Sequence, residues 1–520
     1  MLVQEFLQAS AGRWPQKTAL IFGDQRLTYG EVEAQANRLA NGLRAHGLGR
    51  GDRVAIYLNN SVETVVAIFA ILKAGGTFVV VNHSTKRDKL TYILNHCAAW
   101  GLLLDGRYQA LAVALQAQVP SLRLCLLCGP RPASLPAGLA HFADMQATFS
   151  AARPSPITTI DRDLACLIYT SGSTGAPKGV MSDHSNMVFA ADSIISYLGN
   201  RPDDVVINVL PLSFDYGLYQ LLMVFRFGGT LVLEKGFVFP AAVLEHMVTE
   251  GVTGFPGVPT VYAILLQMDL SPYDLSGLRY MTNTAAALPV SHIQALRQKF
   301  PHVTLYSMYG LTETKRTLYL PPAELDRRPG SVGIAIPGTE VWCEDENGRR
   351  LPPGEIGELV VRGRHVMRGY WADAAATAQR YRPGPLPGET VCYTGDLFRM
   401  DEEGFFYFVG RKDDIIKCRG EKVAPKEVEN VLYALPGVVE TAVIGVPDPI
   451  LGQAIKAFVV QNGDALTEAQ ALAHCRANLE DYMVPQSVVF CDALPKTSSG
   501  KIKKMGLQEL VERRSVIHEP

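Results

Sequence analysis

The stretch Tyr169-Thr-Ser-Gly-Ser-Thr-Gly-Ala-Pro-Lys-Gly179 directly follows an apolar segment, residues 163–168, with the composition of a buried strand. Its glycines allow the backbone to approach a ligand closely, its Ser and Thr hydroxyls can donate hydrogen bonds, and Lys178 adds a positive charge. These features predict a loop that binds a polyphosphate. The spacing differs from G-x-x-x-x-G-K-[ST], because Lys178 is followed by Gly179, so an ordinary P-loop NTPase is disfavoured.

The segments around this loop alternate between helix and strand patterns. Thr28 and Glu31 have the spacing of a capping box, and apolar residues recur behind them at helical spacing, so a helix is predicted from near Gly30. The pattern then predicts strands at 53–58, 77–81, 204–210 and 230–233, and helices at 62–73 and 218–227. Such alternation predicts an α/β fold with parallel sheets in layers.

Beyond about Arg328 the pattern changes to short β-type runs separated by turn signals, which predicts a β-rich subdomain. A charged segment follows, and after it helix and strand patterns alternate again to the end. We therefore expect a large N-terminal domain of layered α/β subdomains plus the β-rich subdomain at residues 1–409. A hinge is expected at 410–414, and a small, mobile C-terminal α+β domain at 415–520.

Composition excludes several other classes of protein. The 520 residues include 49 Lys and Arg against 51 Asp and Glu, spread along the chain, so no basic surface for nucleic acid is expected. Nine cysteines do not suggest a disulfide framework, and Cys125 and Cys128 lie in an apolar run that predicts a strand rather than a metal site. We expect no membrane span and no signal peptide, and hence a cytoplasmic protein.

Five further motifs follow the Tyr169–Gly179 loop. They are Tyr309-Gly-Leu-Thr-Glu-Thr314, Gly357-Glu-Leu-Val-Val-Arg-Gly363, Tyr393-Thr-Gly-Asp396, Gly410-Arg-Lys-Asp-Asp414 and Pro495-Lys-Thr-Ser-Ser-Gly-Lys501. In kind and order, the set resembles the signatures of the adenylate-forming superfamily, which includes acyl-CoA synthetases, amino-acid adenylation domains and luciferases. The resemblance covers nearly the whole chain. It implies a two-step reaction in which ATP first converts a carboxylic acid to an acyl adenylate, and a thiol then takes the acyl group.

The resemblance also implies roles for individual residues. Tyr309 would stack on adenine, Asp396 and Arg411 would hold the ribose, Thr312 would bond the α-phosphate, and Glu313 would bind Mg²⁺. The loop residues implied to bind the nucleotide are Thr170, Ser171, Gly172, Ser173, Thr174, Gly175 and Lys178, with Thr170 also a Mg²⁺ ligand. The alternative for Glu313 is a solvated loop carboxylate, and for Asp396 and Arg411 a turn or hinge ion pair.

Two residues near the C-terminus belong to the implied mechanism. Lys501 lies in a segment rich in Ser, Gly and Lys, which alone is more typical of a solvated tail. The resemblance implies instead that Lys501 is catalytic, together with Thr312 and Glu313, and stabilises charge in the adenylation transition state. Asp413 matches the hinge position about which the small domain would rotate between the two half-reactions. Lys417, Arg419 and Gly420 would then line the path of the thiol.

The acid pocket is expected between the phosphate loop and the Tyr309 segment. Its predicted lining includes Phe214, Asp215, Tyr216, Thr284 and Ala285. Asp215 resembles the aspartate by which adenylation domains hold the α-amino group of an amino acid, and a carboxylate in an apolar pocket needs a cationic partner. The alternative is that Asp215 caps a helix beginning near Tyr216.

The segments from Tyr309 to Pro322 and from Gly410 to Glu429 are similar to stand-alone ligases that load proline or another small amino acid onto a carrier protein. The resemblance therefore implies a ligase that activates a small amino acid such as proline. The thiol acceptor must come from another molecule, because no Asp-Ser-Leu-type phosphopantetheine attachment site is visible. We expect the phosphopantetheine thiol of a separate carrier protein, or of CoA. The main alternative is an AMP-forming acyl-CoA ligase acting on an acid without an amine. A kinase or ATPase, or a binding protein with a decayed site, are more remote alternatives.

Overall fold

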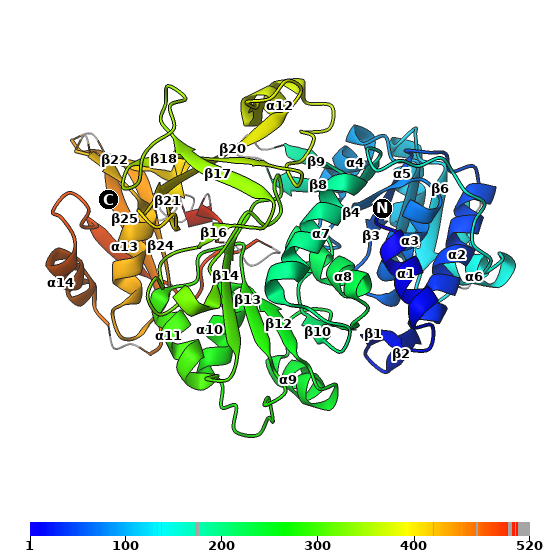
Figure 1. The fold of residues 1–520 in the computed structure, drawn as a ribbon, viewed down its shortest axis with the longest axis horizontal. Coiled ribbons are helices and arrows are strands. Elements are labelled where there is room, and N and C mark those ends of the chain that lie inside the picture. The colour runs from blue at the N-terminus through cyan, green and yellow to red at the C-terminus, as the bar shows by residue number, and fades with distance from the viewer. Residues whose placement is uncertain are drawn as a thin grey trace, which may run out of the picture.

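The computed structural model describes residues 1–132, 134–136, 138–171, 176–419, 421–448, 450–463, 466–497, 502–504 and 506–507. Within these residues the strands form four sheets, two of them large. Figure 1 shows the two large sheets and a β-rich sheet in the N-terminal part, with a small C-terminal α+β domain (orange to red) at the opposite side from the N-terminus. The α/β fold with a large N-terminal and a small C-terminal domain is therefore confirmed.

The first large sheet has seven strands in the order β7-β6-β5-β3-β4-β8-β9. They are β3 (Arg53–Tyr57), β4 (Thr77–Val80), β5 (Gly101–Asp105), β6 (Leu124–Cys128), β7 (Leu139–His141), β8 (Leu164–Ser171) and β9 (Pro177–Asp183). The strands pair in parallel except for the antiparallel hairpin β8–β9. The predicted strand after residue 163 therefore continues into the phosphate loop and returns as β9.

The second large sheet has nine strands in the order β16-β15-β14-β13-β12-β10-β11-β1-β2. They are β1 (Thr18–Phe22), β2 (Gln25–Thr28), β10 (Val205–Asn208), β11 (Thr230–Leu233), β12 (Gly254–Gly257), β13 (Tyr280–Asn283), β14 (Thr304–Tyr309), β15 (Leu318–Tyr319) and β16 (Ile334–Ala335). Its central strands are parallel, and antiparallel pairs occur at both ends of the sheet. This is the second α/β layer that the sequence predicts.

A layer of helices lies between the two large sheets (Figure 1). It contains α1 (Glu5–Arg13), α2 (Tyr29–Ala45), α3 (Val62–Lys73), α7 (His184–Leu198) and α8 (Asp215–Phe227), whose apolar residues belong to one continuous core. The predicted capping box at Thr28 and Glu31 starts α2. The other described helices that precede residue 339 are α4 (Arg87–His96), η1 (Gly106–Tyr108), α5 (Gln109–Gln118), α6 (Phe142–Thr148), α9 (Pro240–Thr249), α10 (Pro259–Gln267), α11 (Val290–Lys299) and η2 (Pro322–Glu324).

The β-rich sheet is antiparallel. It consists of β17 (Thr339–Glu344), β18 (Ile356–Gly363), β19 (Tyr381–Pro383), β20 (Thr390–Met400) and β21 (Phe406–Arg411), with α12 (Ala374–Arg380) beside it. The short helix η3 (Lys412–Asp414) leads to the C-terminal domain. That domain contains β22 (Ile416–Cys418), β23 (Glu421–Val423), α13 (Pro425–Tyr433), β24 (Val438–Asp448), β25 (Gly452–Gln461), α14 (Glu468–Asn478) and β26 (Ser487–Phe490).

The cysteines and the membrane prediction can be compared directly with the structure. All nine cysteines lie in the described residues and are free. Cys125 and Cys128 are buried in β6, as the apolar run predicts, and burial raises the pKa of both thiols. Among the described helices, none is both long enough and apolar enough to cross a bilayer.

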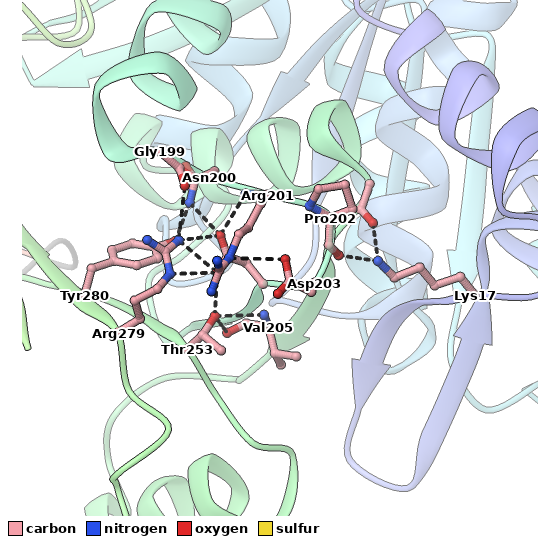
Figure 2. Close-up of polar contacts among 12 residues, drawn as sticks. Lys17, Gly199, Asn200, Arg201, Pro202, Asp203, Val205, Thr253, Arg279 and Tyr280 are labelled. Carbon is pink, nitrogen blue, oxygen red and sulfur yellow. Dashed lines mark hydrogen bonds and ion pairs between the residues drawn. The ribbon is translucent and has the colours of Figure 1, made fainter.

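A buried ion pair fixes the second sheet to the helix layer (Figure 2). The Asp204 side chain is 1% exposed and lies 2.6 Å from the nearest guanidinium nitrogen of Arg279. The same carboxylate accepts hydrogen bonds from the backbone of Arg201 and the hydroxyl of Thr253. Asp204 therefore joins the loop after α7 to the segments that precede β12 and β13.

We predict that Arg279→Met lowers the free energy of unfolding by about 3 kcal/mol, since it leaves the buried Asp204 carboxylate without its cationic partner. Urea unfolding followed by tryptophan fluorescence would measure the change. Arg297→Met is the matched control, because Arg297 pairs with Asp326 in an exposed ion pair that contributes at most about 1 kcal/mol. Equal shifts in the two variants would contradict a special role for the buried pair.

Candidate functional site

The phosphate-loop segment is a hairpin whose two strands carry the predicted nucleotide ligands opposite each other. Thr170 on β8 and Lys178 on β9 are direct register partners. Gly179 faces the ring of Tyr169, and a Cβ at Gly179 would lie 3.1 Å from that ring, so a side chain there fits only if the ring shifts. The predicted ligands Gly172, Ser173, Thr174 and Gly175 lie outside the described residues.

A tyrosine that the sequence analysis missed connects this hairpin to the predicted metal ligand. The Tyr370 hydroxyl donates a hydrogen bond to Oε1 of Glu313 at 2.7 Å. The Lys178 ammonium nitrogen lies 5.4 Å from the centroid of the same Tyr370 ring, within range of a cation–π interaction. Glu313 is only 8% exposed. The signal in the sequence is the short run Gly369-Tyr370-Trp371, whose link to Glu313 only the tertiary structure reveals.

The loop that carries Glu313 makes a tight reversal after β14. A Cβ at Gly310 would lie 1.7 Å from the carbonyl oxygen of Lys315, so only glycine fits there. The amide of Thr317 donates to the carbonyl of Tyr309 at 2.9 Å and closes the reversal. The Glu313 carbonyl accepts a hydrogen bond from the Met367 amide at 2.9 Å, which fixes the loop against the segment before Tyr370. Thr312 lies partly exposed in this loop.

The three residues predicted to bind adenine and ribose lie together. The Tyr309 hydroxyl donates to Oδ2 of Asp396 at 2.6 Å. Arg411 is the register partner of Asp396 across β20 and β21, and its Nε lies 3.7 Å from Oδ1. Burial raises the pKa of the Tyr309 phenol, and the adjacent Asp396 carboxylate acts in the same direction. Tyr309 therefore remains a neutral donor to a carboxylate whose other neighbour is an exposed guanidinium.

Asp215 does not cap a helix, so the capping alternative is wrong. It is the first residue of α8, the N-cap residue is Phe214, and no side chain caps this end. The Asp215 side chain is buried, and its Oδ2 lies 3.8 Å from a terminal nitrogen of Arg316. The predicted cationic partner of Asp215 is thus present within the chain itself.

The other predicted lining residues lie at the start of α8 or just beyond β13. The Tyr216 hydroxyl donates to the carbonyl of Thr282 at 2.6 Å, which joins α8 to β13. Phe214 is half-buried beside the Tyr216 ring. Thr284 is 2% exposed, and Ala285 has φ +76°, a strained conformation for a residue with a side chain.

Sequence analysis also missed Lys315 and Arg316. Their side chains are 0% and 2% exposed, although both residue types normally reach solvent. Burial lowers the pKa of the Lys315 ammonium, and the nearby Asp215 carboxylate partly opposes that effect. The available signal was two adjacent cations inside the otherwise small and apolar segment that follows Thr314.

The predicted hinge and C-terminal catalytic residues are only partly described. Asp413 is exposed in η3, between β21 of the β-rich sheet and β22 of the C-terminal domain. Lys417 and Arg419 are exposed as well. Lys501 and Gly420 lie outside the described residues. Their predicted roles, like that of Asp413, stay predictions.

The donor set around Glu313 fits a magnesium ion held mainly by phosphates. Among the described residues, no group of three or more His, Cys, Asp or Glu side chains could form a metal site by itself. Mg²⁺ bound with a nucleotide needs only one or two carboxylates, because phosphate and water oxygens complete its shell. The buried Glu313 carboxylate, with one oxygen held by Tyr370, meets that requirement.

Fold and site together define a class. A hairpin-borne lysine and a buried glutamate next to the same tyrosine, a Tyr–Asp–Arg group and a small C-terminal domain are typical of adenylate-forming ligases, which couple an acid to a thiol and release AMP. The comparisons agree: the AMP-binding enzyme profile matches residues 7–371, and the AMP-binding enzyme C-terminal domain profile matches residues 427–501. The chain belongs to the AMP-binding enzyme family.

Three similar proteins illustrate the range of the family. The chain is 33% identical to a long-chain-fatty-acid–CoA ligase of Bacillus subtilis (strain 168), over 98% of this chain and 94% of the relative. It is 36% identical to a feruloyl-CoA synthase of an Amycolatopsis species, over 94% and 95%. The crystal structure of the anthranilate CoA ligase AuaEII in complex with anthranoyl-AMP superposes with a TM-score of 0.91 at 29% identity, covering 99% of this chain and 98% of that chain.

We predict that Tyr370→Phe lowers the rate of ATP–pyrophosphate exchange about 10-fold and raises the Mg²⁺ concentration needed for half-maximal rate, because removing an outer-shell partner costs 10–100-fold. Exchange measured over a Mg²⁺ titration would show both effects. Tyr393→Phe is the matched control, since the Tyr393 hydroxyl donates to Glu344 in the β-rich sheet, away from Glu313. An unchanged Mg²⁺ dependence in Tyr370→Phe would contradict the link.

Proposed function

We propose that this protein is an AMP-forming acyl-CoA ligase acting on a carboxylic acid that lacks an α-amine. The observation that carries the proposal is the Asp215–Arg316 pair. Asp215 would hold a substrate amine in an amino-acid ligase, but here its carboxylate lies 3.8 Å from the Arg316 guanidinium. The CoA-ligase names of the relatives support the same choice, and they favour CoA over a carrier protein as the thiol acceptor.

In the first half-reaction, an oxygen of the acid carboxylate attacks the α-phosphorus of ATP. The bond from that phosphorus to the bridging β-phosphate oxygen breaks, and pyrophosphate leaves. Lys178 and the phosphate-loop hydroxyls hold the phosphates, while Thr312 positions the α-phosphate. Tyr309, Asp396 and Arg411 fix adenine and ribose. Holding both reactants in one orientation supplies much of the rate acceleration.

Charge stabilisation is shared between a metal ion and a lysine. When bound, Mg²⁺ neutralises the phosphate oxygens. Glu313 holds its carboxylate toward the phosphates, with Tyr370 fixing its orientation. Lys501 reaches the attacking carboxylate and the α-phosphate, so that its positive charge offsets the charge that accumulates between them.

In the second half-reaction, the CoA thiol loses its proton and its sulfur attacks the acyl carbon. The bond from that carbon to the AMP oxygen breaks, giving the thioester and AMP. The C-terminal domain turns about Asp413 between the steps, which exchanges Lys501 for the segment around Lys417 and Arg419. Such rotation needs a short connection that absorbs the dihedral change, and η3 provides one.

The proposal predicts pyrophosphate exchange with fatty, aryl or short-chain acids and none with proline or other amino acids. Formation of AMP should then require CoA. Asp215→Asn should keep at least about a tenth of the exchange rate, because the carboxylate contacts Arg316 rather than the substrate. Exchange with one amino acid, abolished in Asp215→Asn, would restore the amino-acid function and contradict the proposal.

We predict that Lys501→Ala lowers the adenylation rate about 10²-fold or more while leaving ATP binding in place, because its charge acts on the transition state. Pyrophosphate exchange would measure the rate, and equilibrium dialysis the binding. Lys503→Ala is the matched control, two residues away on the same segment and exposed. Equal exchange rates in the two variants would refute the assignment.

A further inference from the structure

Three charged side chains are buried together where α8 begins. Lys315 is 0% exposed, Arg316 2% and Asp215 5%, so two cationic residues accompany one carboxylate. Arg316 is the largest of the fully buried side chains among the described residues. An arginine remains protonated at any physiological pH, so its charge must be compensated in place.

Asp215 compensates only part of this charge. One terminal nitrogen of Arg316 lies 3.8 Å from Asp215, longer than a normal hydrogen bond. Among the described residues, Nε and the other terminal nitrogen of Arg316 have no hydrogen-bond partner, and neither has Nζ of Lys315. The nearest aromatic faces are Tyr216, 4.4 Å from the guanidinium carbon, and Tyr219, 5.8 Å from the Lys315 nitrogen.

Further buried polar atoms on the surrounding elements lack partners within the described chain. They are the hydroxyl of Tyr219 on α8, Oδ1 of Asn283 at the end of β13, and Oγ1 of Thr284 just beyond it. α8 and β13 are joined beside these atoms by the hydrogen bond from Tyr216 to Thr282. The atoms thus line the region where the acid pocket is expected.

A buried charged donor without a partner costs several kcal/mol, and proteins rarely keep one without a ligand. The guanidinium group presents its free N–H groups in a planar fork that matches a carboxylate. The Arg316 guanidinium lies over the Tyr216 ring on α8, whereas the Glu313 carboxylate on the same loop accepts a hydrogen bond from Tyr370. The loop therefore offers two separate positions near which a negatively charged group of the reactants can bind.

We propose that the acid activated by this protein carries a second carboxylate, which Arg316 and Lys315 bind while the first carboxylate reacts with ATP. Asp215 is a positioning residue that orients the guanidinium group and leaves its Nε side for the substrate. The inference rests on the proposed function and specifies its substrate as a dicarboxylic acid. Tyr219, whose ring lies 5.8 Å from the Lys315 nitrogen, supplies a hydroxyl near the same group.

The experiment compares straight-chain dicarboxylic acids, from malonate to suberate, with their monomethyl esters in pyrophosphate exchange. For at least one chain length, wild-type kcat/KM should favour the diacid by about 10²-fold or more, because a site with buried donors rejects a ligand that cannot pair with them. In Arg316→Met that preference should fall below about 10-fold. Arg297→Met, at an exposed ion pair on α11, should keep the wild-type preference.

A second measurement covers the case in which Arg316→Met fails to fold. The Tm of the wild-type protein with AMP should rise with the preferred diacid and remain unchanged with its monomethyl ester. Equal changes of Tm with the diacid and with its monomethyl ester would overturn the inference.

The remaining outcomes separate this inference from the proposed function. One outcome is that pyrophosphate exchange with aliphatic or aryl monoacids is at least as fast as with every diacid. That result would overturn the inference of a second substrate carboxylate but would leave the proposed acyl-CoA ligase function standing. Equal loss of diacid and ester activity in a folded Arg316→Met would mean that Arg316 binds the reacting carboxylate, which also overturns the inference. No exchange with any acid would overturn the proposed function, and the inference with it.

Discussion

The close approach of Gly310 to the Lys315 carbonyl is the constraint on which the site depends. A Cβ at Gly310 would lie 1.7 Å from that oxygen, so the chain can reverse here only because glycine has no side chain. The reversal directs the side chains of Glu313 and Arg316 to different neighbours. Glu313 accepts a hydrogen bond from Tyr370, while Arg316 lies beside Asp215 on α8. One loop of the second large sheet therefore supplies residues to both the predicted nucleotide site and the predicted acid pocket.

Side chains from all three N-terminal sheets meet near this loop. Lys178 comes from the hairpin of the first sheet, Tyr309 from the second, and Asp396 and Arg411 from the β-rich sheet. Each side chain is positioned by its own strand, and strands position functional groups more precisely than isolated loops. The continuous core between the two large sheets holds these two sheets in fixed positions relative to each other.

The sequence predicted the local secondary structure and missed contacts between residues that are distant along the chain. The strand before the phosphate loop, the capping box of α2 and the β-rich sheet follow from periodicity and turn residues, and the structure confirms them. The local signals at Tyr370 and Arg316, an aromatic run and two adjacent cations, do not reveal the importance of these residues, because their partners are distant along the chain. For Asp215, the spacing allowed a helix cap and the resemblance implied an amine ligand, and neither prediction could foresee a guanidinium supplied by another loop.

The charge balance around Asp215 also explains why the amine and the dicarboxylate hypotheses exclude each other. An ammonium group placed at Asp215 would approach the Arg316 guanidinium and the Lys315 ammonium, and its attraction to one carboxylate would be offset by repulsion from two cationic side chains. A substrate carboxylate placed there would be attracted by the two cationic side chains and repelled by one carboxylate. It would also pair with donors that otherwise have no hydrogen-bond partner among the described residues. Under the proposed function, discrimination against amino acids would follow from the electrostatics of the buried site.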